Sequence, residues 1–184
     1  MVVPSMTRKE ITKELLNDYD AFLNSSTQDR IIADYNRCRL KSKIKKEEEY
    51  PKFYEIRTKS KNNWIIMVRK HPLNKKFQYP EDCGLEPFMY YYNKYGINVL
   101  STTIDYKIAH FYQHFFDRYR LRMELNLPNM LDVIKMYFKR NNSHYYNFLP
   151  QQDGSIKTLG IVKDGFVYGE MDKVGLMGSG TNSL

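Results

Sequence analysis

Cysteine and long apolar stretches are both scarce in this chain. Only two cysteines occur in 184 residues, Cys38 and Cys83, and neither has a second Cys or a His close enough to form a zinc knuckle. A small secreted protein held by disulfides normally contains more cysteines in even-numbered patterns, so we expect two reduced thiols. No run approaches the roughly 18 apolar residues of a membrane-spanning helix, and charge interrupts the N-terminal segment before a signal-peptide core forms. These absences predict a cytoplasmic protein that does not associate with a membrane.

Aromatic residues and positive charge, in contrast, are abundant. The aromatic content is 15% and the hydrophobic content is 42%, which is more than a disordered chain carries. The formal net charge is +8, and residues 37–76 alone hold 14 Lys or Arg against 4 Glu. Such a basic segment attracts polyanions by releasing their counterions. We therefore expect nucleic acid as the partner, RNA rather than DNA, with an acidic protein inhibitor as an alternative.

The N-terminal part of the chain has a helical period. Thr7 and Glu10 stand at the spacing of a capping box, and apolar residues then recur on one helical face. A second apolar stripe follows and ends before Pro51, and its second half is nearly all charged. The pattern predicts a helical hairpin, an N-terminal helical arm over residues 1–50, whose second helix projects into solvent.

After this arm the apolar period changes to that of β-strands. Hairpins are predicted over residues 52–70, over 88–106 around Tyr95-Gly96, and over 155–172 around Asp164-Gly165, with helices over 107–125 and 129–142. The hairpin connections predict an α+β fold: an N-terminal helical hairpin followed by a mostly antiparallel sheet packed on two further helices. The core domain is predicted over residues 51–172. Residues 173–184 contain "GLMGSGT", which lacks the ending of a phosphate-binding loop, and are predicted to form a flexible tail.

The helix predicted over residues 107–125 carries two histidines and two arginines at four-residue intervals. These are His110, His114, Arg118 and Arg122. At about 100° per residue they form a polar stripe beside the apolar face of the helix. The stripe has three interpretations: a metal site, a site that cleaves phosphodiesters, or the polar flank of a buried helix.

The metal interpretation rests on His110 and His114, because residues at i and i+4 of a helix can share one ion. In zinc peptidases of the H-E-x-x-H kind a Glu follows the first His and activates water, but Phe111 occupies that position here. A metal-dependent hydrolase that uses His110 and His114 is therefore an alternative on a loose pattern. We predict no metal ion and no other cofactor.

The phosphodiester interpretation rests on the other members of the stripe. A ribonuclease that works without metal needs an acid/base group. An imidazole suits this role in general, so His114 is the candidate. Arg118 and Arg122 can hold the phosphate, because guanidinium stays charged and donates two parallel hydrogen bonds. His110 would assist His114. The four residues are thus the candidate catalytic set.

The helix and the antiparallel hairpin that follows it, over residues 106–172, resemble the metal-independent ribonuclease toxins of bacterial toxin-antitoxin systems, with their barnase-like or colicin-like fold. The resemblance implies a metal-independent endoribonuclease. Such toxins add a Lys, Ser, Thr or Tyr from the sheet, and the matching positions here are Lys157, Thr158 and Tyr168. The long N-terminal helices are not part of that minimal fold.

The structural interpretation of the stripe also stays open. Flanking His and Arg residues on an aromatic helix often hydrogen-bond to backbone ends and cover apolar surface. Asp117 and Glu124 are close enough along the helix to pair with Arg120 and other cations. The protein would then be a non-catalytic nucleic-acid or protein-interaction module. The bias toward Lys, Asn, Tyr and Ile is typical of an AT-rich genome, such as that of a phage or mobile element.

A separate nucleic-acid-binding surface is predicted around the first hairpin, because the ends of a hairpin would gather its cations onto one edge. The predicted members of this surface are Arg57, Lys59, Lys61, Arg69, Lys70, Lys75 and Lys76. Interleaved aromatic residues such as Phe53 and Tyr54 could stack on bases, whereas Trp64 is expected in the core.

Overall fold

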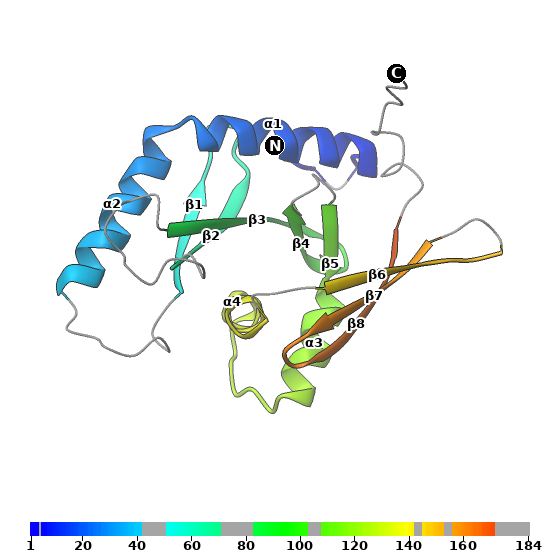
Figure 1. Ribbon diagram of the computed structural model, residues 1–184. Helices are drawn as coiled ribbons and strands as arrows, with labels where there is room; N and C mark the ends of the chain where they lie inside the picture. The colour runs from blue at the N-terminus through cyan, green and yellow to red at the C-terminus, as the bar shows by residue number, and fades with distance from the viewer. Residues whose placement is uncertain are drawn as a thin grey trace, which may run out of the picture. The chain divides into compact units, whose positions relative to one another are not determined.

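The computed structural model describes most of the chain and divides it into two compact units. The described residues are 1–3, 5–41, 51–70, 83–102, 108–141, 145–152 and 156–171. The first unit is Met1–Phe115 and the second is Phe116–Leu184. Figure 1 shows the chain coloured from blue at the N-terminus to red at the C-terminus. The division falls at a different place from the predicted boundaries after residues 50 and 172, and the predicted tail lies outside the described residues.

The first unit consists of two helices and a five-stranded antiparallel sheet. The helices are α1 (Arg8–Leu23) and α2 (Ser26–Lys41), and the strands are β1 (Lys52–Arg57), β2 (Asn63–Lys70), β3 (Cys83–Asn93), β4 (Gly96–Thr102) and β5 (Ile108–Tyr112). The strands pair in chain order, β1-β2-β3-β4-β5. The first two predicted hairpins are therefore present as β1-β2 and β3-β4.

The second unit contains two helices and a three-stranded antiparallel sheet. Its elements are α3 (Gln113–Arg122), which begins in the first unit, α4 (Met130–Arg140), β6 (Tyr145–Pro150), β7 (Ile156–Val162) and β8 (Gly165–Met171). The order is β6-β7-β8. The predicted turn at Asp164-Gly165 is confirmed, and Gly165 has a φ of 131°, which favours glycine. The α+β class and the antiparallel pairing are confirmed, in two sheets rather than one.

The N-terminal helices form where the sequence predicts them. The Thr7 side chain accepts a hydrogen bond from the backbone N–H of Glu10, and the Glu10 carboxylate accepts one from the backbone N–H of Thr7, so the capping box is present. A short break at Asn24 and Ser25 separates the helices, and α2 leaves the end of α1 at an angle (Figure 1). The charged segment 42–50 lies outside the described residues.

Both helices share one hydrophobic core with the five-stranded sheet. Leu15 of α1 and Tyr35 of α2 are almost fully buried and belong to the same cluster as Trp64. The predicted arm therefore packs on the sheet as far as α2 is described and does not project freely into solvent. All residues from Trp64 to Val68 on β2 are buried, so both faces of this interior strand are inaccessible over that stretch, and the expectation for Trp64 is confirmed.

A buried carboxylate joins α1 to the β1-β2 turn. Asp18 is 3% exposed, and its Oδ2 accepts hydrogen bonds from the Trp64 indole at 2.7 Å, the Thr58 hydroxyl at 2.8 Å and the Asn62 amide at 3.0 Å. The Oδ1 of Asn62 accepts the backbone N–H of Val2 at 2.8 Å, which extends the network to the N-terminal segment. Because all three donors to Asp18 come from one hairpin, the carboxylate fixes α1 at a single position along it.

The segment predicted as the start of a long helix forms strand β5 instead. Ile108–Tyr112 pairs with β4 in the register Leu100↔His110, and α3 begins only at Gln113. The helix prediction is therefore wrong for residues 108–112. Ile108, Phe111 and Tyr112 are β-branched or aromatic, residue types that favour strands, although their spacing also fits a helical face. The backbone hydrogen bonds offered by β4 select the strand.

The β3-β4 turn holds the start of α3. Gly96 has a φ of 106°, a conformation that side chains other than glycine rarely adopt. The Oε1 of Gln113 accepts the backbone N–H of Ile97 at 2.9 Å and lies only 1.7 Å from where a Cβ at position 96 would be. A larger residue at position 96 would therefore displace Gln113, the first residue of α3.

None of the helices among the described residues has both the length and the apolar character needed to cross a membrane.

Replacing Asp18 by Ala is expected to lower the free energy of unfolding by about 2–4 kcal/mol, because buried Trp64 and Asn62 donors lose their acceptor. Asp18→Asn keeps one acceptor oxygen and should cost less. Chemical denaturation followed by circular dichroism measures both, and the exposed Asp20→Ala on the same helix serves as control, with a change within about 0.5 kcal/mol. A loss for Asp18→Ala no larger than that of the control would contradict the structural role of Asp18.

Candidate nucleic-acid interface

The first histidine of the predicted stripe lies on a strand, not on a helix. Because β5 alternates its side chains, His110 shares a face of the sheet with Asn98 and Tyr91 on neighbouring strands. Its Nε2 lies 3.2 Å from the Asn98 Oδ1 and 3.4 Å from the Tyr91 hydroxyl. The predicted helical spacing of His110 and His114 is therefore wrong, and with it the geometry on which a shared metal ion depended.

Four rings follow one another from the core of the first unit to its surface, and we call them the ring series: Tyr91, His110, Tyr112 and His114. The centroid distances along the series are 6.2, 4.2 and 5.9 Å. The last pair is stacked, with only 13° between the ring planes. Tyr91 is 9% exposed, Tyr112 is 37% exposed, and His114 at the end is exposed. The sequence analysis missed Tyr91, Tyr112 and Asn98, because their proximity depends on strand register.

The remaining three members of the stripe keep the predicted spacing. His114, Arg118 and Arg122 lie one turn apart on α3 and are all exposed, whereas Phe116 and Tyr119 of the same helix are buried. The predicted pairing of Asp117 with Arg120 is confirmed, since the Arg120 guanidinium lies 3.7 Å from the carboxylate of Asp117. The exposed side of α3 thus presents one imidazole and two guanidinium groups.

The sheet residues matched to the ribonuclease toxins do not share one side of their sheet. In the β6-β7-β8 register, Lys157 and Tyr168 lie on one face and Thr158 lies on the other. The Oγ1 of Thr158 is 2.9 Å from where a Cβ at Gly169 would be, so it packs closely on the backbone of β8. Lys157, Thr158 and Tyr168 therefore cannot serve a single reacting group together.

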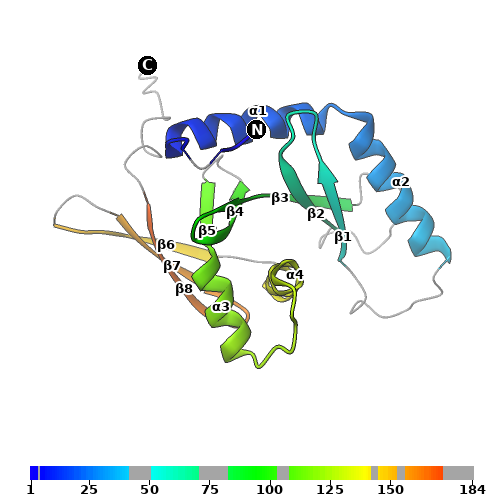
Figure 2. The ribbon, with the colours of Figure 1, turned by 180° about the vertical axis from the view of Figure 1, so that it is seen from behind.

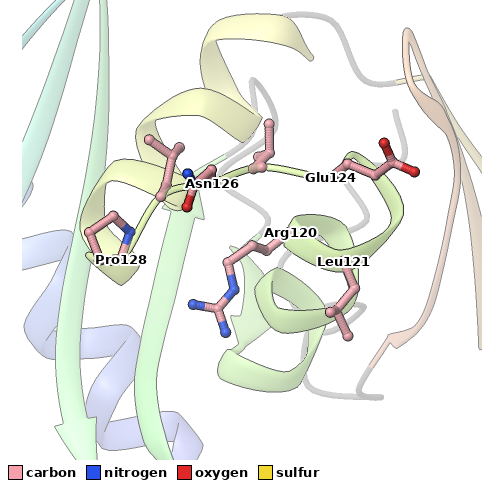
Figure 3. Close-up of a pocket in the computed structure, with 7 residues that line it drawn as sticks. Arg120, Leu121, Glu124, Asn126 and Pro128 are labelled. Atoms are coloured by element: carbon pink, nitrogen blue, oxygen red, sulfur yellow. The ribbon is translucent and has the colours of Figure 1, made fainter.

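A pocket of about 400 Å³ opens at the end of α3, away from the stripe. It is lined by Arg120, Leu121, Glu124, Leu125, Asn126, Leu127 and Pro128. In Figure 3, Arg120 extends into the space toward Asn126 and Pro128, whereas Leu121 and Glu124 point away from it. His114, Arg118 and Arg122 are not among the residues that line this pocket. It is therefore not the catalytic cleft that the sequence hypothesis required.

The predicted basic surface is divided between the two ends of the first hairpin. Arg57, Lys59 and Lys61 are exposed at the β1-β2 turn. Arg69 and Lys70 lie at the other end of β2, about 20 Å away at roughly 3.3 Å per residue. The prediction that the hairpin gathers these cations onto one edge is therefore wrong. The side chain of Lys70, like Lys75 and Lys76, lies outside the described part of the chain.

One cation of the hairpin, Arg69, is held by a carboxylate of the neighbouring strand. Arg69 forms an ion pair with Glu86 on the neighbouring strand, and burial raises the pKa of the Glu86 carboxyl above its usual value. Because the pair ties β2 to β3, Arg69 has a partner within the sheet.

A second carboxylate cluster joins α2 to β1. Asp34 accepts hydrogen bonds from Lys52 at 2.6 Å, from Arg37 at 2.7 Å and from the Tyr54 hydroxyl at 2.9 Å. These bonds, that of Lys52 first, hold the pKa of Asp34 well below its usual value, and burial raises the pKa of Tyr54 to about 12. The free thiol of Cys38 lies 3.1 Å from the Lys52 ammonium. Tyr54 is therefore part of the tie between α2 and β1, and the reduced state predicted for Cys38 is consistent with its free thiol.

A third cluster organises the second unit. Asp164, in the β7-β8 turn, accepts two hydrogen bonds from the Arg140 guanidinium at 2.8 and 2.9 Å, one from the Tyr119 hydroxyl at 2.7 Å and one from the Asn141 amide at 3.0 Å. The bonds from Arg140 contribute most to lowering the pKa of Asp164 to about 2. Because the donors come from α3 and the end of α4, the cluster fixes the β7-β8 hairpin on both helices.

No protein-family model, curated protein or solved structure matches the chain. Among the described residues, no three His, Cys, Asp or Glu side chains come together in a way that could hold a metal ion. The clusters around Asp34 and Asp164, whose pKa values are lowered, join structural elements. Among the described residues, the ring series and the exposed side of α3 lie outside these clusters.

The Asp164 cluster predicts a specific acid sensitivity. A carboxylate with a pKa of about 2 in the folded protein and about 3.9 in the unfolded chain contributes about 2 kcal/mol of stability above pH 5, and this contribution is lost as the pH falls toward 2. Asp164→Asn should therefore be less stable than the wild type at pH 7, and the difference should narrow between about pH 5 and pH 2. Denaturant titrations at several pH values measure the difference in the free energy of unfolding between the wild type and Asp164→Asn. A difference that stays constant with pH would contradict the lowered pKa of Asp164.

Proposed function

We propose that the protein binds single-stranded nucleic acid, RNA in preference to DNA, at the end of the ring series and along the exposed side of α3. The observation that carries the proposal is the stack of Tyr112 and His114, which ends in an exposed ring. A base placed on the outer face of His114 would continue this stack. Arg118, one turn further along α3, would then bind a phosphate of the same strand.

The energetics favour this arrangement over a purely electrostatic one. Stacking of a base on an aromatic ring contributes about 1–3 kcal/mol, and it needs a ring that is held in place before the base arrives. Tyr112 is already in contact with His110, whose Nε2 lies within hydrogen-bonding distance of Asn98. The ring that receives the base is therefore supported by three layers of ordered side chains.

The same geometry supports a single strand as the ligand. Bases in a duplex are stacked on each other and offer only their edges, whereas unpaired bases can be placed on protein rings. Successive turns of an α-helix rise by about 5.4 Å, so Arg118 and Arg122 offer two guanidinium groups in a row to a strand that follows α3. A cytoplasmic location, where RNA is available, is part of this proposal.

Binding is tested with a fluorescently labelled single-stranded RNA of about 12 nucleotides. This length lies within the range that known single-strand-binding domains cover. His114→Ala and Arg118→Ala are each expected to raise the dissociation constant about tenfold, through loss of a stacked base and of a phosphate contact. Fluorescence anisotropy measures the affinity at several salt concentrations, and the salt dependence should weaken for Arg118→Ala.

The matched control for this experiment is Arg30→Ala, which removes an equal charge from the exposed side of α2. It should change the affinity by less than about twofold, since a distant exposed charge contributes little at physiological salt. Equal losses for Arg30→Ala and Arg118→Ala would mean that only the net charge attracts RNA, and the proposed site would be wrong.

A metal-independent ribonuclease is the second candidate, favoured by the retained spacing of His114, Arg118 and Arg122. His114 would remove the proton of the 2′-hydroxyl, and the resulting oxygen would attack the phosphorus while the arginines bind the phosphorane. The bond to the 5′-oxygen would then break, which leaves a 2′,3′-cyclic phosphate, and the leaving 5′-oxygen would take a proton from water. His110 has no part in this version, because its Nε2 lies against Asn98 and Tyr91 on β5.

The two candidates are separated by incubating the protein with labelled RNA in EDTA. If the ribonuclease hypothesis is right, the RNA is cleaved, and cleavage falls by at least about 100-fold for His114→Ala, the scale of a general acid/base. Arg118→Glu should abolish it while the circular dichroism spectrum is unchanged. A mobility shift without cleavage would remove the ribonuclease candidate and leave the binding function.

A further inference from the structure

The three-stranded sheet of the second unit has one face on which large apolar side chains meet solvent. Antiparallel register places the following described residues on this face, which we call the open face: Asn147 and Leu149 of β6, Lys157, Leu159 and Ile161 of β7, and Phe166 and Tyr168 of β8. Leu149 is 49% exposed, Ile161 44%, Phe166 62% and Tyr168 79%. Four large apolar residues on one continuous face form a patch of the kind that marks an interaction site.

The other face of the same sheet is occupied. Gly160 of β7 is buried there, and Thr158 packs against Gly169. Figure 1 and Figure 2 view the second unit from opposite sides, and α3 lies behind the sheet in one and in front of it in the other. Since the large residues of the open face are exposed, α3 lies against the opposite face. The exposure of Phe166 and Tyr168 is therefore a property of a sheet that is covered on one side only.

The chemistry of the open face fits a protein surface better than a nucleic acid. Leu149 and Ile161 are aliphatic and offer no ring to a base. The two charged positions of this face among the described residues, Lys157 and Glu170, stand opposite each other in the β7-β8 register at one end of the sheet, so its centre carries no charge. Depletion of charge together with enrichment of Tyr and Phe is typical of the centre of a protein interface. The exposed side of α3 has the opposite composition, with two guanidinium groups and one imidazole on successive turns.

We propose that the open face binds a second copy of this chain, so that the protein forms a twofold symmetric dimer by packing one β6-β7-β8 sheet on another. A twofold axis brings the same patch of both subunits together. The large apolar side chains of the open face can then pack against their own copies in the second subunit. Two sheets pack about 10 Å apart with their inner side chains interdigitated. With the axis running across the strands, the two copies of Lys157, at the start of β7, lie at opposite rims and do not repel each other.

The size of the patch sets the strength of this dimer. If each large side chain has roughly 200 Å² when fully accessible, the four exposed fractions correspond to on the order of 450 Å² per subunit. The pair then buries about 900 Å², about a quarter below the lower limit of about 1,200 Å² for standard protein interfaces and in the range of weak, transient ones. A dimer of this size is expected to have a dissociation constant in the micromolar range, on the order of 10–100 μM. The inference does not rest on nucleic-acid binding.

The test is sedimentation equilibrium of the full chain, without RNA, over concentrations from roughly 1 to 300 μM, which brackets the expected dissociation constant. The average mass should rise from the 22.1 kDa of one chain toward twice that value. Tyr168→Glu and Phe166→Glu should each raise the dissociation constant at least tenfold. The control is Tyr95→Glu, which changes a residue that is 76% exposed in the first unit and should leave the association unchanged.

Circular dichroism and the unfolding midpoint establish that the variants fold, and Tyr168→Ser provides a milder change if a glutamate prevents folding. A chain that stays monomeric at the highest concentration would overturn the proposal. The proposal would also fail if the open-face variants associated as strongly as the wild type. If Tyr168→Glu and Phe166→Glu had the same average mass as the wild type at every concentration but bound labelled RNA more weakly, the open face would be a nucleic-acid surface and not a dimer interface.

Discussion

The hydrogen bonds to the buried carboxylate of Asp18 are the constraint on which the first unit depends. They connect the middle of α1 to Thr58, Asn62 and Trp64 on a single hairpin, and hydrophobic packing alone would not fix the helix along that direction. Once α1 is held there, Leu15 and the residues of α2 cover one face of the sheet. That face also carries His110 and Tyr91, and Tyr91 belongs to the same core cluster as Leu15, so the ring series starts from the core that the network helps to hold.

The charged residues of this protein fall into two groups with different roles. Asp34 and Asp164 each accept several hydrogen bonds from residues on other elements, and their lowered pKa values reflect these bonds. Such clusters resemble catalytic sites when pKa values alone are considered. Each carboxylate, however, accepts its hydrogen bonds from residues of the fold itself. The residues that we propose for nucleic-acid binding, the exposed members of α3 and the end of the ring series, belong to neither cluster.

The sequence predicts features that depend on neighbouring residues and misses those that depend on strand pairing. The capping box at Thr7 and the turn at Gly165 follow from local chemistry, and both are present. The spacing of Ile108, Phe111 and Tyr112 fits a helix, while their residue types also suit a strand, so only pairing with β4 could decide between the two. The spacing of Arg118 and Arg122 could be read from the sequence, whereas the contact between His110 and Asn98 required the register.

The close approach of Gln113 to Gly96 gives a turn residue influence over a site that it does not touch. Any side chain at position 96 would compete with the Gln113 amide for the same space, and Gln113 directly precedes the outermost ring, His114. Under the proposed function, natural variants that exchange this glycine would lose RNA affinity through the displacement of Gln113. Sequence variation at the β3-β4 turn would then report on the function of the protein, not merely on the tolerance of an exposed loop.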